Sequence, residues 1–127
     1  MATPIQTVNE LVQGINAGDL NLAVAAYEND AILMAQPGVT ARGTSQIREA
    51  LSGFIAMKAQ LRSEAQQVIE NQDVALYIGR WSLNGTDPSG KPVSMGGEST
   101  DVLRRQPDGR WLIALDNPWG AQILPPR

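Results

Sequence analysis

Residues 93–117 read VSMGGESTDVLRRQPDGRWLIALDN and contain two strand-like segments around a turn. The segments at 93–105 and 110–117 carry apolar and β-branched side chains suited to a pleated sheet. Between them, Pro107, Asp108 and Gly109 form a sequence typical of a tight turn. The stretch therefore predicts a long antiparallel hairpin, so the chain must contain a β-sheet.

Two further strands are predicted before this hairpin. Residues 74–83 are rich in Val, Ile, Tyr and Trp, and a loop rich in Gly, Pro and Asp follows at 84–92. Residues 58–72 give conflicting signals, because their Ala, Gln, Glu, Lys and Leu content favours a helix. A helix from Ser45 through Gln72 would be unusually long for a chain of this size. We therefore predict a strand in this segment.

The first part of the chain predicts three helices. Thr3 is a good N-cap, Pro4 suits the first helical position, and apolar residues at helical spacing follow up to Gly18. Asp19 caps a second, short helix, which is expected to extend to Tyr27. Three more features complete the pattern: a strand at 31–35, a stop at Pro37-Gly38, and a third helix from Gly43 with Ile47, Leu51, Phe54 and Ile55 on one face. The order predicts an α+β fold, with three N-terminal helices packed on a curved antiparallel sheet.

The chain has 127 residues, no Cys, no His and a formal net charge of −3. This length predicts a single domain over residues 1–127. Without Cys or His, thiolate nucleophiles, Ser-His-Asp triads and most transition-metal sites are excluded. Acid–base chemistry must then use carboxylates, Tyr or Lys. Gly96-Gly97 is not followed by a predicted helix, which argues against a phosphate-binding loop, and we expect no cofactor and no metal.

The charge pattern also restricts the partners and the location. The chain is net negative and has no basic run, so no nucleic-acid partner is expected. No apolar stretch approaches the roughly 20 residues of a membrane span, so no membrane partner is expected either. The N-terminal sequence has neither the basic nor the apolar region of a secretory signal, which predicts a cytoplasmic location.

Several short strings occur in an order that resembles the NTF2-like, or SnoaL-like, superfamily. They are Asn16-Ala17-Gly18-Asp19-Leu20, Tyr27-Glu28-Asn29-Asp30-Ala31, Pro37-Gly38 and Gly43-Thr44-Ser45-Gln46-Ile47-Arg48-Glu49, then Asp101 to Trp111 and Leu115 to Gly120. The similarity spans about residues 4–120 and is greatest to the uncharacterised branch with a DUF4440-type domain. Ketosteroid isomerase, limonene epoxide hydrolase, scytalone dehydratase and polyketide cyclases belong to this superfamily.

The resemblance implies a cone-shaped, cystatin-like fold. In this fold the sheet wraps around the helices and leaves an apolar cavity open at one end, where a small hydrophobic molecule binds. The resemblance further implies that the other face of the sheet forms a homodimer interface.

The active-site residues of the ketosteroid isomerase-like members carry over only in part. The position of their carboxylate base is Gln36 here, and an amide cannot accept a proton at useful pH. The Tyr that stabilises the oxyanion falls near Leu11, and the Tyr that supports it falls near Leu51. The second oxyanion donor of these members, an Asp that an apolar site keeps protonated, falls on Asp101.

The epoxide hydrolase-like members give a similar result. Their Arg-x-Asp sequence matches Ser99-Thr100-Asp101, so the Asp is present and the Arg is not. Their second Asp resembles Asp116. The scytalone dehydratase-like members use His, which this chain lacks.

Asp101 is also unusual from the residues alone, because Asp is unfavourable in the middle of a strand. If the side chain faces an apolar cavity, burial raises its pKa and makes it a candidate catalytic acid or base. If it instead faces solvent or pairs with an Arg such as Arg80 or Arg104, it has no such role. Both alternatives are open at this point.

The neighbours of Asp101 depend on the register of the hairpin. With a three-residue turn and a bulge, one face of the hairpin carries Ser99, Asp101, Leu103, Ile113, Leu115 and Asn117. Asn117 is then a polar partner of Asp101, and Asp116 points away. A slip by one residue places Asp116 beside Asp101 instead. We favour the first register because its inner face is more apolar.

Other residues are candidates for the cavity wall: Tyr27, Gln36, Trp81, Ser99, Asn117 and Trp119. Gln36 and Asn117 are expected to orient the ligand by hydrogen bonds. Trp119 follows the last strand, near the expected mouth of the cavity, and Trp81 shares a strand face with Tyr77. Each aromatic residue has an ordinary alternative in core packing.

Two functions fit these observations. The first is an acid–base enzyme of isomerase, cyclase or hydrolase type that acts on a small hydrophobic molecule through Asp101. The second is a non-catalytic, dimeric module that binds a ligand or a partner protein. The missing base, oxyanion Tyr and Arg favour the second function, and the mid-strand Asp favours the first.

Overall fold

The computed structural model describes residues 2–127 as three α-helices and one six-stranded sheet. The helices are α1 (Pro4–Ala17), α2 (Leu20–Val24) and α3 (Gly43–Ala56). The strands are β1 (Tyr27–Gln36), β2 (Val39–Arg42), β3 (Gln60–Asn71), β4 (Val74–Thr86), β5 (Pro92–Arg105) and β6 (Trp111–Asn117), and a short 3-10 helix, η1 (Gly120–Ile123), follows. The predicted α+β class is confirmed.

The sheet is mixed, with the strand order β2-β1-β6-β5-β4-β3. Neighbouring strands are antiparallel except β1 and β6, which are parallel. The prediction of a wholly antiparallel sheet is wrong at this pair. No hairpin joins β1 to β6, so no turn sets their relative direction.

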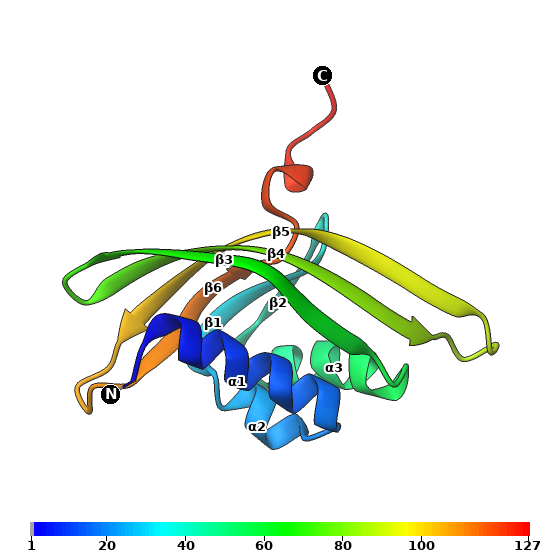
Figure 1. Ribbon diagram of the computed structural model, residues 1–127, viewed down its shortest axis with the longest axis horizontal. Coiled ribbons are helices and arrows are strands. Elements are labelled where there is room, and N and C mark those ends of the chain that lie inside the picture. The colour runs from blue at the N-terminus through cyan, green and yellow to red at the C-terminus, as the bar shows by residue number, and fades with distance from the viewer. Residues whose placement is uncertain (1) are drawn as a thin grey trace.

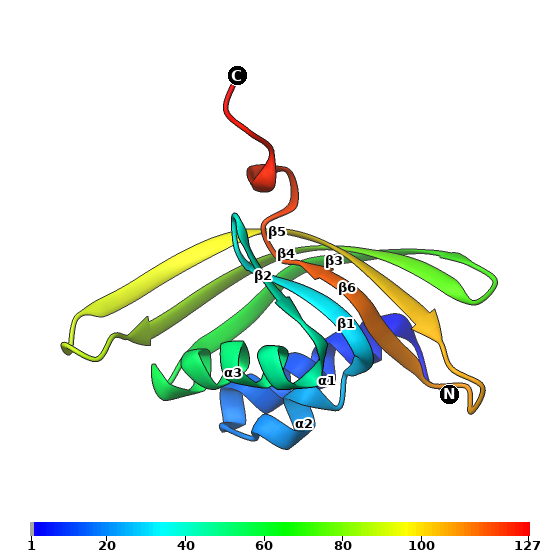
Figure 2. The ribbon, with the colours of Figure 1, turned by 180° about the vertical axis from the view of Figure 1, so that it is seen from behind.

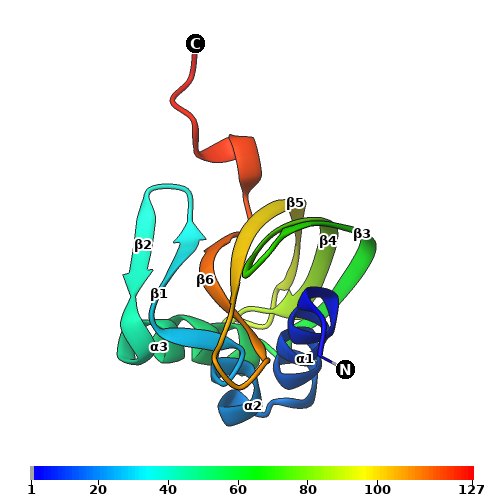
Figure 3. The ribbon, with the colours of Figure 1, turned by 90° about the vertical axis from the view of Figure 1, so that its left-hand side faces the viewer.

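The sheet curves over the helices. Figures 1 and 2 show α1, α2 and α3 beneath its concave face, and the C-terminal segment leaving from the opposite side. Figure 3 shows the β1–β2 hairpin on one side of this arrangement and β3, β4 and β5 curling over α1 on the other. The core lies between the concave face and the helices, where Ile47, Leu103 and Ile113 are fully buried. None of the helices within residues 2–127 is long and apolar enough to cross a membrane.

The predicted helix caps are present. The Thr3 hydroxyl accepts a hydrogen bond from the backbone N–H of Gln6 at 3.1 Å, and Gly18 ends α1 with a φ of 71°. Asp19 caps α2 in the same way. The expectation that α2 reaches Tyr27 is wrong, because Tyr27 is the first residue of β1 and pairs with β6.

The segment with conflicting signals is a strand, as predicted. β3 pairs with β4 along nearly its whole length, from Gln60 opposite Asn84 to Asn71 opposite Val74. Tertiary structure overrides the local helix propensity here, because the strand forms a full ladder of backbone hydrogen bonds with β4 and packs Leu61 against the core.

The register of the β5–β6 hairpin departs from the prediction through one bulge. Leu103 lies opposite Ile113, as the favoured register requires, but Val102 lies opposite Leu115. Ala114 is therefore an extra residue in β6, and it shifts the rest of the strand by one position. Beyond this bulge Asp101 lies opposite Asp116, so the prediction that Asp116 points away is wrong.

Candidate functional site

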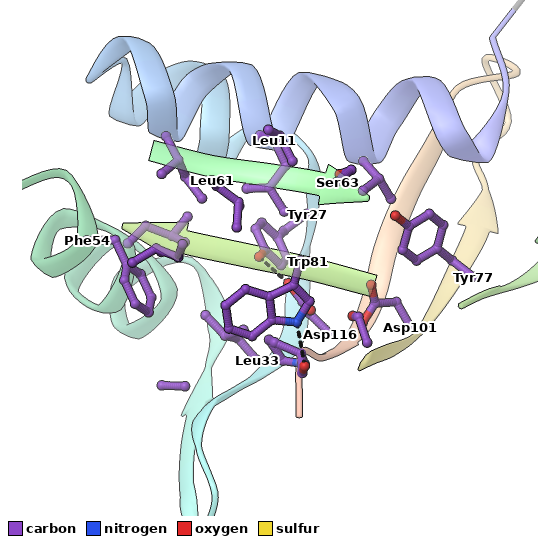
Figure 4. Close-up of a pocket in the computed structure, with 18 of the residues that line it drawn as sticks. Leu11, Tyr27, Leu33, Phe54, Leu61, Ser63, Tyr77, Trp81, Asp101 and Asp116 are labelled. Atoms are coloured by element: carbon purple, nitrogen blue, oxygen red, sulfur yellow. Dashed lines mark hydrogen bonds between the residues drawn. The ribbon is translucent and has the colours of Figure 1, made fainter. Parts of the chain in front are cut away.

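An apolar cavity of about 100 Å³ lies between the helices and the concave face of the sheet. Its apolar wall includes Leu11 and Ile15 of α1, Leu51 and Phe54 of α3, Leu33 of β1 and Leu61 of β3. Figure 4 shows these elements around the cavity, with two carboxyl groups on the sheet side. Ligand pockets commonly measure roughly 300–1,000 Å³, so this cavity suits only a very small molecule.

The two carboxyl groups belong to Asp101 and Asp116, which both line the cavity. They are directly opposite each other on neighbouring strands and are 4% and 7% exposed. Two carboxylates held this close repel each other, which favours protonation of one of them. The cavity wall therefore carries a pair of acids within direct reach of one another.

Three donors hold this pair in place. Oδ1 of Asp101 accepts hydrogen bonds from the Ser99 hydroxyl at 2.7 Å and from the backbone N–H of Asn117 at 2.8 Å. The Tyr27 hydroxyl donates to Oδ2 of Asp116 at 2.5 Å. These bonds leave one oxygen of each carboxyl group for the other acid or for a ligand.

Burial and mutual repulsion raise the pKa of the pair. The pKa of Asp101 lies well above its ordinary value because the group is desolvated and Asp116 is negatively charged. Burial also raises the pKa of Asp116, although its hydrogen bonds to Asp101 and Tyr27 lower it. The same burial and charges raise the pKa of Tyr27, which keeps its hydroxyl proton and acts as a donor.

No basic side chain neutralises the pair within the described residues. Arg80 pairs with Glu98 at 3.2 Å, and Arg104 pairs with Glu28 at 2.9 Å. Both arginine side chains are more than half exposed. The alternative in which Asp101 pairs with one of these arginines is thereby excluded.

A second polar group lies in the same cross-strand row. Tyr77 of β4 is directly opposite Asp101 and also lines the cavity. Its hydroxyl accepts a hydrogen bond from the Gln66 side chain at 3.0 Å. The ring lies over Gly79, where a Cβ would be only 2.5 Å from the phenol oxygen, so glycine makes room for this orientation.

Two tryptophans line the cavity beside the end of β6. The Trp81 and Trp119 rings meet edge to face, with centroids 5.4 Å apart. The Trp81 indole N–H donates to the carbonyl of Pro118 at 2.7 Å, and that of Trp119 donates to the carbonyl of Met34 at 3.1 Å. These bonds hold both rings against the cavity.

The sequence-predicted site residues divide into two groups. The structure brings five of them together at the cavity: Asp101, Tyr27, Trp81, Ser99 and Trp119. It does not bring Gln36 there, because this residue is exposed at the end of β1. The Asn117 side chain also lies outside the lining, because it bonds to Thr100 and Gly120, and only its backbone N–H reaches Asp101.

The sequence-based site lacked three polar residues that line the cavity. Asp116 was placed on the wrong face because nothing in the sequence marks the bulge at Ala114. Tyr77 and Ser63 are the other two. The spacing of Tyr77 and Gly79 was an available signal, because glycine in a strand often marks a close approach by another group.

The described part of the chain holds no group of three acidic side chains that could bind a metal ion. The donors at the cavity are instead two carboxyl groups and several hydroxyls. This set can transfer protons and form hydrogen bonds with a ligand.

The fold and the site together define a cone-shaped α+β protein with an acid pair on the wall of an apolar cavity. The chain belongs to the SnoaL-like domain family, whose sequence model matches residues 8–113. The architecture is the NTF2-like, or cystatin-like, fold, as predicted. No curated protein sequence matches the chain.

Three solved structures illustrate the likeness of fold. An NTF2-like superfamily protein from Salmonella enterica has a TM-score of 0.79 at 18% identity, with 88% of this chain and 84% of that chain covered. A candidate ketosteroid isomerase from Shewanella frigidimarina gives 0.72 at 18% identity, with 87% and 89% covered. A protein from Catenulispora acidiphila, solved in complex with S-DNPA, gives 0.73 at 18% identity, with 88% and 86% covered.

Proposed function

We propose that this chain is an acid–base enzyme that binds a small, largely apolar molecule in the cavity and exchanges a proton with it through Asp101 and Asp116. The observation that carries the proposal is the pair of buried carboxyl groups directly opposite each other on the cavity wall. Buried acids with a raised pKa retain a proton near neutral pH and can donate it. The ligand complex of the Catenulispora acidiphila protein supports a binding role for this fold.

The cavity limits the size of the ligand. A volume of about 100 Å³ is smaller than the roughly 150 Å³ apolar cavity that accommodates benzene in another protein. A small ring or a short branched chain therefore suits the enclosed space, and a steroid-sized molecule does not. A larger ligand would have to extend beyond the enclosed space or displace Trp81 and Trp119.

The acid pair supplies both halves of a proton transfer. In the first step the proton on the pair passes to an oxygen or nitrogen of the ligand, which leaves both groups as carboxylates. Ser99 and the N–H of Asn117 stabilise the charge on Asp101, and Tyr27 stabilises the charge on Asp116. A proton taken from a neighbouring atom of the ligand then restores the pair, and the net result is an isomerisation.

Hydrogen–deuterium exchange tests this function. Cyclopentanone is a small cyclic ketone of the proposed kind, and catalysed exchange of its α-hydrogens in D₂O reports proton transfer. We expect Asp101→Asn to lose about 10²–10⁴-fold in exchange rate, the usual contribution of an acid–base group, while ketone binding is retained. Asp108→Asn removes an exposed carboxyl group and is the matched control. Exchange that is unchanged in Asp101→Asn would rule out its catalytic role, and ketone binding without exchange in the wild type would favour a non-catalytic module.

The outer face of the sheet supports a second proposal, that the protein is a homodimer. Ile69, Leu76, Val102 and Leu115 form one cross-strand row over β3, β4, β5 and β6. Ile69, Leu76 and Leu115 are each more than a third exposed, as is Ile78 beside them. A contiguous apolar patch of this kind is typical of a protein–protein interface. Homodimerisation through this face also suits the non-catalytic alternative, a dimeric ligand-binding or protein-interaction module.

Sedimentation at micromolar concentration tests the dimer. We expect a dimeric mass for the wild type and a monomeric mass for the double variant Leu76→Lys/Ile78→Lys. Leu124→Lys alters an exposed leucine outside the sheet and should remain dimeric. A monomeric wild type would contradict the proposal. The cytoplasmic location and the relation to the DUF4440-type branch stay predictions.

A further inference from the structure

We infer that the ligand carries a protonated amine beside the atom that exchanges a proton with the acid pair, so that the cavity prefers small apolar amines to alcohols of the same size. The inference rests on the proposed function, because it concerns the ligand of the same cavity. The juxtaposition that carries it is a buried acid pair with no cation, facing an apolar space lined by aromatic rings.

The charge on the cavity wall is of one sign. The described ionisable side chains that line it are Asp101 on β5, Asp116 on β6, Tyr27 on β1 and Tyr77 on β4. The parts of α1, α3 and β3 that face the cavity contribute apolar side chains and Ser63. When the pair carries one proton, its net charge is −1, and no lysine or arginine of the described chain compensates it there. A ligand that carries its own positive charge supplies this missing partner.

The usual cost of a buried ion pair is reduced here. Burial of two opposite charges is often unfavourable, because both ions must leave water. In this protein the carboxyl groups are desolvated in the folded state before any ligand binds. Only the ammonium group of the ligand must then lose its water, and its N–H groups regain hydrogen bonds on the acid pair.

The acid pair has room for these hydrogen bonds. Two carboxylates offer about eight lone-pair positions in all. Ser99, Asn117 and Tyr27 donate three hydrogen bonds to the pair. Acceptor positions therefore remain for an ammonium group.

The aromatic side chains favour the same kind of ligand. Trp81, Trp119, Phe54 and Tyr77 line the cavity. An ammonium group within about 6 Å of an aromatic face is attracted to it, most strongly by Trp. A neutral alcohol gains neither this attraction nor the charge of the acid pair. Cyclopentylamine and cyclopentanol form a matched pair of probes, because they have nearly the same size and shape and differ in charge.

Binding is measured by following the tryptophan indole N–H signals in ¹⁵N-resolved NMR titrations. The chain has three tryptophans. Trp81 and Trp119 line the cavity and report binding there, whereas Trp111 does not line it and serves as the internal control. We expect cyclopentylamine to bind about tenfold or more tightly than cyclopentanol at about pH 8, the lower end of what close charge pairs contribute.

The preference should depend on pH with a definite sign. As the pH falls through the titration of the pair, the pair takes up its second proton and becomes neutral, so cyclopentylamine loses its advantage, while the affinity for cyclopentanol changes little. The double variant Asp101→Asn/Asp116→Asn should lose the preference and retain binding of cyclopentanol. The variant Asp73→Asn/Asp108→Asn removes two exposed charges instead and should keep the preference.

The possible outcomes distinguish a failure of this inference alone from a failure of the proposed function. Equal affinities for the two probes, or a preference that survives in the double Asn variant, would overturn the inference and leave the cavity as a ligand site. Failure of both probes to move the Trp81 and Trp119 signals would count against the proposed function and the inference together.

Discussion

Tyr27→Phe gives the most direct test of the charge state of the acid pair. The substitution removes only the hydroxyl that donates to Oδ2 of Asp116 at 2.5 Å, and the buried ring stays. No large cavity forms, so the cost comes from the lost hydrogen bond. A hydrogen bond to a charged group contributes about 1.5–3 kcal/mol, and one between neutral groups about 0.5–1.5 kcal/mol. The expected loss is therefore about 2 kcal/mol at about pH 8, or about 1 M in the urea midpoint.

The loss should shrink at acid pH. The Tyr27 hydroxyl lowers the pKa of Asp116, so its contribution to stability is present when the pair is ionised and is lost as the pH falls through the titration of the pair. Urea unfolding followed by circular dichroism, at about pH 8 and about pH 4, measures both values. Tyr77→Phe is the matched control, because the Tyr77 hydroxyl bonds to the neutral side chain of Gln66. The reasoning is refuted if the Tyr27→Phe loss is the same at both pH values or no larger than that of Tyr77→Phe.

Three further predictions concern other parts of the molecule. The raised pKa of Asp101 makes the folded state bind more protons than the unfolded state above pH 3.8, the ordinary pKa of Asp. Wild-type stability should therefore fall as the pH rises through the titration of the pair, and Asp101→Asn should flatten this fall in pH-dependent urea titrations. Gly79→Ala places a Cβ 2.5 Å from the Tyr77 hydroxyl and should lower the free energy of unfolding by about 1–3 kcal/mol, measured by thermal or urea unfolding. Gly53→Ala has no neighbour within 4 Å of the new Cβ and should raise the free energy of unfolding by about 0.4–1 kcal/mol. The reverse order of the two variants would contradict the packing argument. Thr3→Ala removes the N-cap of α1 and should cost about 0.5–2 kcal/mol, with Thr3→Ser restoring most of it.

The elements of the fold that depend on local chemistry could be predicted from the sequence. The cap at Thr3, the left-handed end of α1 at Gly18 and the turn at residues 106–110 each depend on residues close together in the chain. The parallel pairing of β1 with β6 joins residues more than eighty positions apart, and no turn sequence sets its direction. The strand β2 was also missed, because its four residues are too few to show a periodic pattern.

In the candidate site, too, the contacts between residues could not be predicted from the sequence. Asp101 stood out because an acid is unfavourable within a strand and because the family resemblance places a functional Asp at the same position. Its true partner could not be selected in this way, because Asp116 and Asn117 are adjacent in sequence and point to opposite faces. Gln36 was selected only through the family resemblance, and it is exposed at the end of β1.

The extra residue at Ala114 decides what chemistry the cavity can perform. Without it, the pairing of Leu103 with Ile113 would continue to Asp101 opposite Leu115, and the wall would carry one acid beside an aliphatic side chain. With it, Leu115 is exposed on the outer face and Asp116 turns inward. This arrangement costs stability twice, because it exposes a leucine and buries a second carboxyl group. The fold does not require either cost, since apolar residues would fill the same positions at least as well. A function that uses two acids at one site gives the bulge a reason, which is why the cavity rather than the outer surface is the place to look for the activity.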